Sequence, residues 1–131
     1  MSFQVEGCTI ENALVAEGSI IVQADIRHAL IGIRARIGRG VRIQDSLILG
    51  ADFYETLEEM AQGTSDGIPP MGIGEDTIIE KAIVDKNARI GRGVRIVNEA
   101  GDTERDGPGY HIREGIVVVT KNAVIPDGTV I

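Results

Sequence analysis

The chain has 131 residues, a length that fits one domain with a continuous apolar core. Tryptophan is absent and aromatic residues make up only 3% of the chain, so Ile and Val must build that core. The net charge of −7 argues against nucleic acid as the main partner, and the single cysteine, Cys8, excludes an internal disulfide and a cysteine-based zinc site.

Residues 5–31 carry aliphatic side chains at steps of five or six residues. We interpret this segment as the irregular first part of a coil, because the ends of a solenoid commonly depart from its internal repeat. The residues concerned are Val5, Ile10, Val15, Ile21, Ile26 and Ile31.

A nine-residue segment, 35–43, recurs letter for letter as 88–96, and each copy contains the pattern Ile-Gly-x-x-x-x-Ile. A period of six does not fit the apolar spacing of an α-helix. It is typical of a hexapeptide solenoid, in which the chain winds as a triangular coil and each short face stacks on the coil below. The aliphatic residues on this step are Ile31, Ile37, Ile43, Leu49, Ile78, Val84, Ile90, Ile96, Val119, Ile125 and Ile131.

A second, smaller inward position lies four residues after most of these. Four glycines fall where a sharp corner needs backbone freedom, namely Gly38, Gly40, Gly91 and Gly93. The pattern as a whole predicts an all-β protein, a parallel β-helix of hexapeptide repeats. The smaller inward residues are Ala35, Val41, Leu47, Ala82, Ala88, Val94, Ala123 and Thr129.

Two excursions, near residues 51–72 and 98–115, interrupt the coil of this single domain, which spans 1–131. We expect two helical turns over 55–62 that Gly63 ends, and an irregular loop over the second excursion. Loops on a rigid scaffold commonly carry function, although a solvated decoration is the alternative.

Lys and Arg are concentrated in two windows, 27–42 and 81–95, with five in each. Such clustering permits a local anion site in an acidic protein. Two arginine triplets lie in these windows, and we interpret them as solvated edges because no aromatic residues interleave to stack bases. The triplets are Arg36, Arg39 and Arg42, then Arg89, Arg92 and Arg95.

Three segments together resemble the C-terminal left-handed β-helix domain of ADP-glucose pyrophosphorylase (glucose-1-phosphate adenylyltransferase). They are Gly-Ala-Asp-Phe-Tyr-Glu at 50–55, Val-Asp-Lys-Asn-Ala-Arg-Ile-Gly at 84–91, and the segment 115–131 that contains Lys-Asn-Ala-Val-Ile-Pro. The resemblance covers roughly residues 20–131 and implies a left-handed coil with both excursions in the family's places.

The family's enzyme makes ADP-glucose and pyrophosphate from ATP and glucose-1-phosphate with Mg²⁺, for glycogen or starch synthesis. The glycine-rich phosphate loop, catalytic Asp and sugar-phosphate Lys of its catalytic domain have no counterpart in this sequence. The resemblance therefore implies a regulatory and oligomerisation domain without catalysis or cofactor of its own. With no signal segment or membrane-length apolar run, we expect it in the cytosol, or in the plastid of a plant.

The family's β-helix helps to bind effectors, which are phosphorylated sugars or acids and inorganic phosphate. The resemblance carries this role to Lys86 and Lys121, with Arg89 and Arg113 as supplements. Lys86 and Lys121 each lie two residues after an inward aliphatic residue, so both occupy the same outward corner position. Lysine approaches a phosphate dianion as a point charge on a flexible stem. The alternative is that both lysines are ordinary solvent-facing charges.

Two other functions remain open. A hexapeptide-repeat acyltransferase would need a histidine general base, for which His28 and His111 are the candidates. Two histidines are too few for the three-histidine metal site of a hexapeptide carbonic anhydrase, and we expect no metal ligand in the chain. A purely structural or designed scaffold would show the same fold without a ligand. We also expect a homo-oligomer, either a dimer or a trimer, because exposed strand edges and apolar flanks favour association.

Overall fold

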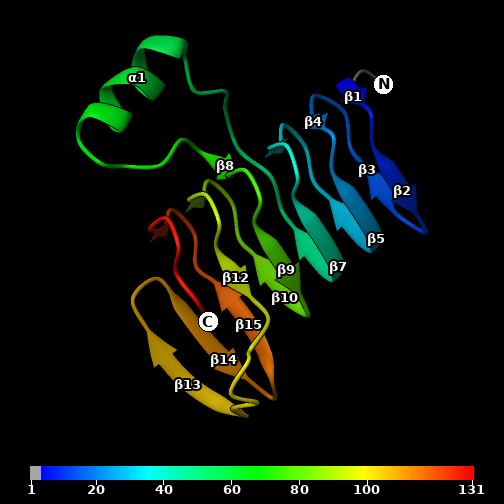
Figure 1. Cartoon of the computed structure of the whole chain (residues 1–131), viewed down its shortest axis with the longest axis vertical. Helices are drawn as coiled ribbons and strands as arrows, with labels where there is room; N and C mark the ends of the chain where they lie inside the picture. The colour runs from blue at the N-terminus through cyan, green and yellow to red at the C-terminus, as the bar shows by residue number, and fades with distance from the viewer. Residues whose placement is uncertain (1–3) are drawn as a thin grey trace.

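The computed structural model describes residues 4–131, with side chains described from residue 7 onward. Short parallel strands stack coil upon coil, and Figure 1 shows the coils side by side from the N-terminal to the C-terminal end. The first face of the coil is a six-stranded parallel sheet. Its strands in spatial order are β1 (Gln4–Glu6), β4 (Ile20–Val22), β6 (Arg36–Ile37), β8 (Gly72–Ile73), β11 (Arg89–Ile90) and β16 (Val124–Ile125).

The second and third faces join in one ten-stranded sheet, because two long strands run continuously round the corner between them. These are β5 (Asp25–Ile31) and β7 (Arg42–Ile48). The second face is completed by β2 (Thr9–Glu11), β9 (Ile78–Glu80) and β12 (Arg95–Ile96). The third face is completed by β3 (Leu14–Val15), β10 (Ala82–Val84) and β15 (Ile116–Val119).

Each face sends one column of aliphatic side chains into the core, so the core is a stack of thin layers. Strand register aligns these residues coil by coil, and each is at most 4% exposed. β-branched side chains suit this packing because they fit closely against neighbours on a pleated surface. The columns are Ile21, Ile37, Ile73, Ile90 and Ile125; Ile26, Ile43, Ile79 and Ile96; and Ile31, Ile48, Val84 and Val119.

The predicted spacing of six residues between inward side chains is wrong at one corner of the coil. There the inward residues are five apart, so Ile48 and Ser46 are buried where Leu49 and Leu47 were predicted, and Ile79 replaces Ile78. A residue with a positive φ stands at each short corner, but residues of this conformation also stand at corners that keep the six-residue step, so the positive φ alone does not account for the shorter spacing. At the short corner they are Asn12 (φ 50), His28 (φ 49), Asp45 (φ 52) and Lys81 (φ 50), and at six-residue corners they include Arg34 (φ 54) and Asn87 (φ 62).

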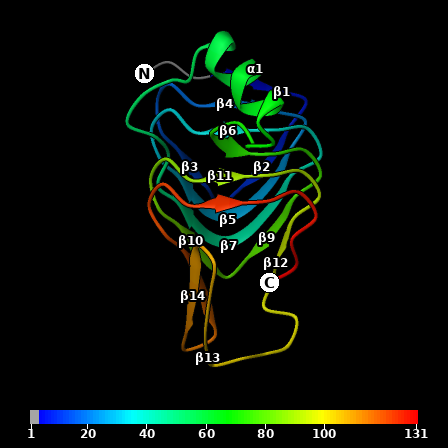
Figure 2. The ribbon, with the colours of Figure 1, turned by 90° about the vertical axis from the view of Figure 1, so that its left-hand side faces the viewer.

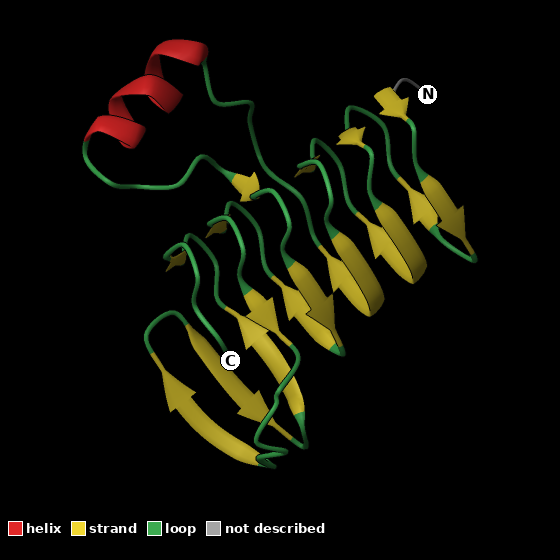
Figure 3. Cartoon of the chain, in the orientation of Figure 1, coloured by secondary structure: helices red, strands yellow, loops and turns green. Residues whose placement is uncertain are grey.

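The first excursion leaves the coil after β7 and contains α1 (Leu57–Ser65), which projects away from the strands (Figures 1 and 3). The helix begins two residues later than predicted and runs through Gly63. Thr56 and Glu59 form a capping box at its start, with Glu59 N donating to Thr56 Oγ1 at 3.1 Å. None of the helix residues is buried. No helix among residues 4–131 is long and apolar enough to cross a membrane.

The second excursion is partly a hairpin, which differs from the irregular loop that we expected. Strands β13 (Glu104–Gly107) and β14 (Tyr110–Arg113) pair antiparallel, and β14 pairs antiparallel with β15. Figure 2 shows this hairpin extending one face of the coil beyond the stacked strands. Ile112 is fully buried against the core, so the excursion closes the end of the third face and is more than a solvated decoration.

Candidate functional site

Lys86 and Lys121 lie on adjoining coils at the same corner. Each follows an inward valine by two residues, and those valines, Val84 and Val119, are register partners in β10 and β15. The backbone agrees with this stacking, because Asn122 N donates a hydrogen bond to Lys86 O at 3.0 Å. The structure therefore brings together two side chains that are 35 positions apart, as their shared place in the repeat predicted.

A carboxylate from the first excursion lies between the two ammonium groups. Lys86 Nζ is 3.2 Å from Asp52 Oδ1, and Lys121 Nζ is 3.9 Å from Asp52 Oδ2. Asn87 holds the same carboxylate, since its Nδ2 donates to Asp52 Oδ2 at 3.0 Å and its Oδ1 accepts from Asp52 N at 2.9 Å. Hydrogen bonds from Asn87 and then Lys86 hold the pKa of Asp52 below its usual range. We call these four residues, Asp52, Lys86, Asn87 and Lys121, the lysine cluster.

Arg89 lies near the lysine cluster in sequence but has a different partner. Its guanidinium donates to Glu55 Oε2 at 2.6 Å and to Pro69 O at 3.1 Å. The other oxygen of Glu55 accepts a hydrogen bond from Met71 N at 2.8 Å. Glu55 is almost completely buried, with its side chain 6% exposed. This ion pair joins the two ends of the first excursion to the coil, so it has a structural role in the described geometry.

Arg113 lies on the hairpin and pairs with a different acid. Its Nη1 is 2.8 Å from Asp106 Oδ1, and the same nitrogen donates to Ile112 O. The hydrogen bond and charge of Asp106 raise the pKa of Arg113, and Arg113 followed by His111 lowers the pKa of Asp106. Among the described side chains, Arg113 forms no hydrogen bond or ion pair with the lysine cluster. The structure therefore does not bring all four predicted cations together.

Asp52, Glu55 and Asn87 were missed as site residues when the sequence was read alone. Asp52 and Glu55 belong to the segment 50–55, and Asn87 directly follows Lys86, so all three were within the motifs that carried the resemblance. Their roles were hidden because they depend on how the excursion folds back over the coil. The sequence did offer one signal. Asp52 and Glu55 lie in the stretch 44–80, which contains no Lys or Arg.

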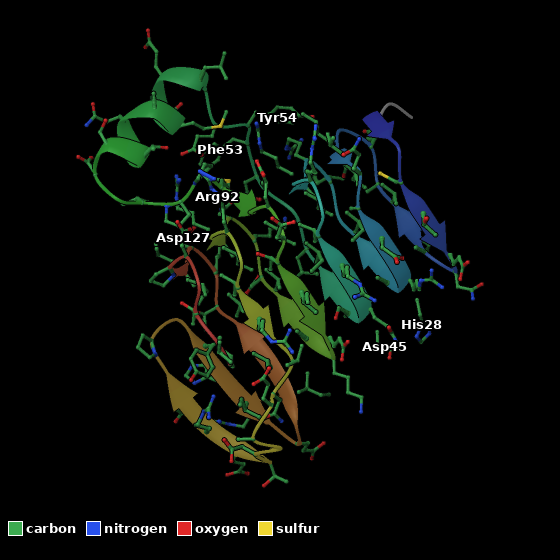
Figure 4. The ribbon with its side chains drawn as sticks, in the orientation of Figure 1. His28, Asp45, Phe53, Tyr54, Arg92 and Asp127 are labelled. Carbon is green, nitrogen blue, oxygen red and sulfur yellow. The ribbon has the colours of Figure 1, made fainter. Side chains whose placement is uncertain are left out.

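One residue of each arginine triplet, Arg39 or Arg92, lies in a row of alternating charge. Register places the residues two positions after the inward Ile37, Ile73, Ile90 and Ile125 in one corner row. Their charges alternate in the order Arg39, Glu75, Arg92 and Asp127. Figure 4 shows Arg92 and Asp127 near one another at this corner, and Asp127 Oδ1 accepts a hydrogen bond from Arg92 N at 2.8 Å. For Arg39 and Arg92, this alternation agrees with the interpretation of the triplets as solvated edges.

Each histidine of the chain contacts an aspartate. His28 Nδ1 is 2.7 Å from Asp45 Oδ1, and Figure 4 shows the two side chains at the outer edge of the coil. His111 Nδ1 is 2.8 Å from Asp106 Oδ1. An aspartate can orient a histidine for proton transfer, but the His28 side chain is 79% exposed and no polar group that would hold an acceptor converges on it in the described structure. Among residues 4–131, no group of three or more His, Cys, Asp or Glu is placed to hold a metal ion.

The coil, its two excursions and the lysine cluster can be compared with known families. The model of one family, described as the GLGC left-handed parallel beta-helix domain, matches residues 2–130. The match covers almost the whole chain, gives the coil its left hand, and agrees with the resemblance to ADP-glucose pyrophosphorylase carried by segments 50–55, 84–91 and 115–131. The chain therefore belongs to the family of the GLGC left-handed parallel β-helix domain, the C-terminal domain of ADP-glucose pyrophosphorylase.

Proposed function

We propose that this chain is a regulatory domain of ADP-glucose pyrophosphorylase and that Lys86 and Lys121 bind the phosphate group of its effectors. The observation that carries the proposal is the pair of ammonium groups that share one carboxylate on adjoining coils. An anion with several oxygens can contact both cations at once, as Asp52 does. The activity that such a domain would regulate is the synthesis of ADP-glucose from ATP and glucose-1-phosphate.

The lysine cluster favours phosphate for electrostatic reasons. Lys86 and Lys121 repel each other, so an anion between them lowers the energy of the pair. Their side chains are 41% and 56% exposed, which leaves them open to a ligand from solvent but also screens their charge. Asp52 already neutralises one of the two charges. We therefore expect weak binding by this chain, with a Kd of about 1 mM, which corresponds to roughly −4 kcal/mol.

Arg89 and Arg113 are left out of the proposed site. The first holds Glu55 and the second holds Asp106, and either would have to give up a short ion pair to reach a ligand at the lysine cluster. The chemistry that remains selects an anionic oxygen group and does not distinguish fructose phosphates, 3-phosphoglycerate and inorganic phosphate.

The test is a calorimetric titration of this chain with fructose-1,6-bisphosphate and with inorganic phosphate. Lys86→Ala and Lys121→Ala should each lower the affinity by about tenfold, since each removes one of two cations. Lys81→Ala is the matched control, because Lys81 is the third lysine, is exposed and forms no side-chain ion pair within the described part of the chain. It should bind as the parent chain does. Equal heats for all four proteins, or no heat at millimolar ligand, would reject phosphate binding by this domain.

A further inference from the structure

A groove with a volume of about 510 Å³ lies between the outer side of the first face and the returning end of the first excursion. It extends from the coil of β4 to that of β16, and neighbouring strands are about 4.8 Å apart, so its length is about 19 Å. Figure 4 shows two of its residues, Arg92 and Asp127, below the helix of that excursion. Hollows of this size commonly hold a small molecule. The lining includes no residue of the lysine cluster.

Glycine forms the floor of the groove. Gly38, Gly74 and Gly91 each come directly after an inward isoleucine of the first face, so strand register stacks them in one column. The stacking of the coils requires these glycines, because a Cβ atom at Gly74 would lie 2.5 Å from Gly91 C, and one at Gly91 would lie 2.6 Å from Asp127 N. The same requirement leaves backbone as the surface that a ligand would meet.

The first excursion supplies an apolar wall along one side of the groove. Pro69 and Met71 are buried, and Ile68 beside them is 40% exposed. The wall is held to the coil, because Pro69 O accepts a hydrogen bond from Arg89 and Met71 N donates one to Glu55. An apolar part of a ligand could therefore cover Ile68 without first ordering a mobile segment.

Three exposed arginines, Arg36, Arg39 and Arg92, also line the groove. None of their guanidinium groups forms a hydrogen bond or an ion pair within the described part of the chain. Glu75 and Asp127 line the same groove, so three cations against two carboxylates leave a net charge of +1. Asp127 is already engaged, since its Oδ1 accepts from Arg92 N at 2.8 Å. The lining therefore has guanidinium donors available for an anionic oxygen group.

We propose that this groove binds a small amphipathic organic anion. Its carboxylate contacts the guanidinium groups of Arg39 and Arg92, and its apolar body lies on the glycine floor against Ile68. Arg39 and Arg92 are two coils apart, about 10 Å, so both flexible side chains can reach one carboxylate between them. A guanidinium binds a carboxylate through two parallel hydrogen bonds. An inorganic anion would leave the apolar wall uncovered, and a neutral apolar molecule would leave the arginines without a partner.

This groove and the lysine cluster lie at different corners of the coil. Lys86 follows Val84 of the third face, whereas Arg39 follows Ile37 of the first face and precedes Ile43 of the second. The inference does not rest on the proposed function, and the two can fail separately. A chain that binds the amphipathic anion without binding phosphate would contradict only the proposed function.

The first test is a titration of the isotope-labelled chain with octanoate, followed by the chemical shifts of its amides. Signals of Gly38, Gly74 and Gly91 report on the floor, and those of Asn87 and Asn122 report on the lysine cluster. Octanoate should shift the glycine signals to saturation, with a Kd of about 1 mM, and leave the asparagine signals in place. Octanol lacks the charge and acetate lacks the apolar body, so each should bind at least about tenfold more weakly.

The second test uses variants at exposed positions, whose fold circular dichroism should show to be unchanged. Arg39→Ala and Arg92→Ala should each weaken octanoate binding by about tenfold, and Ile68→Ser by about threefold or more. Glu75→Gln should strengthen it, because an opposing charge is removed. Arg42→Ala is the matched control, since Arg42 belongs to the same triplet as Arg39 but lies outside the groove, on the second face.

Three results would overturn the assignment. The first is octanoate binding by Arg39→Ala and Arg92→Ala that is as tight as in the parent chain. The second is binding of octanol or acetate as tight as that of octanoate, which would show only apolar adhesion or only charge attraction. The third is the absence of a saturable shift of the three glycine signals at millimolar octanoate.

Discussion

A single carboxylate, that of Asp52, sets how much positive charge Lys86 and Lys121 offer to a ligand. It contacts both ammonium groups from the excursion side, and Asn87 fixes its position with two hydrogen bonds. A ligand anion must either displace this carboxylate or bind beside it. Asp52 therefore competes with the proposed effector, and the strength of that competition is a property of one residue.

Replacement of Asp52 by Asn should raise the affinity of the chain for inorganic phosphate by about tenfold at low salt, because one unit of opposing charge is removed. Calorimetry at two salt concentrations checks this, and the gain should shrink as salt rises. Asp85→Asn is the control, since Asp85 precedes Lys86 but its carboxylate accepts from the Lys86 backbone N. A loss of affinity in Asp52→Asn would show that the carboxylate helps to hold the ligand.

The same contacts predict a pH dependence. The pKa of Asp52 is lowered in the folded chain by Asn87 and Lys86, so this group stabilises the fold above its unfolded pKa. That contribution disappears as pH falls through the folded pKa, in the acid range below the ordinary value of Asp. Thermal unfolding of the parent chain and Asp52→Asn should therefore differ most near neutral pH and converge in strong acid. A difference that grows in acid would contradict the assignment.

At the scale of elements, the first excursion is attached to the coil by its two ends rather than by its helix. We call these ends, Glu55 and Pro69–Met71 with their contacts to Arg89, the neck. No residue of α1 is buried, whereas Glu55 joins Arg89 and Met71 N in a nearly buried cluster. A nine-residue helix is marginal without packing, so its capping box and the fixed neck are what hold it.

Glu55→Gln should destabilise the chain by about 2 kcal/mol, because it leaves the partly buried Arg89 without its counter-charge. Urea denaturation measures the loss. Glu58→Gln is the control, since Glu58 is an exposed residue of α1, and surface changes of this kind usually stay within about 0.5 kcal/mol. Equal stability of the parent chain and Glu55→Gln would show that the neck pair contributes nothing.

Elements also show where sequence reasoning succeeded and where it stopped. The repeat of 35–43 in 88–96 was enough to predict the coil, most of its inward residues and the shared corner of Lys86 and Lys121. The five-residue spacing at the corner of His28, Asp45 and Lys81 was missed because the identical segments 35–43 and 88–96 cover only a corner with the six-residue step. The cluster at Asp52 was missed because a contact across 34 residues follows from the path of an excursion, which has no period.

At the scale of the whole molecule, each coil contacts only the coils before and after it, apart from the excursions. The stability of such a solenoid is approximately a sum over coils and their interfaces. An interior coil therefore loses contacts on two sides when its core residue is truncated, and an end coil loses them on one.

Ile43→Ala should cost about 3–4 kcal/mol, because Ile43 is fully buried between the coils of β5 and β9 and the cavity has packed walls on both sides. Ile10→Ala should cost roughly 1 kcal/mol, since Ile10 is only half-buried and pairs on one side with Ile26 in the described structure. Urea denaturation should be run at one protein concentration, because dimer formation would make the apparent stability depend on concentration. The two variants differ in a second observable. Hydrogen exchange in Ile10→Ala should quicken only in the first coils, whereas Ile43→Ala should quicken exchange on both sides of its coil. Equal losses and the same exchange pattern in both variants would mean that the coils unfold as one unit, and the stack would then have to be treated as a single cooperative core.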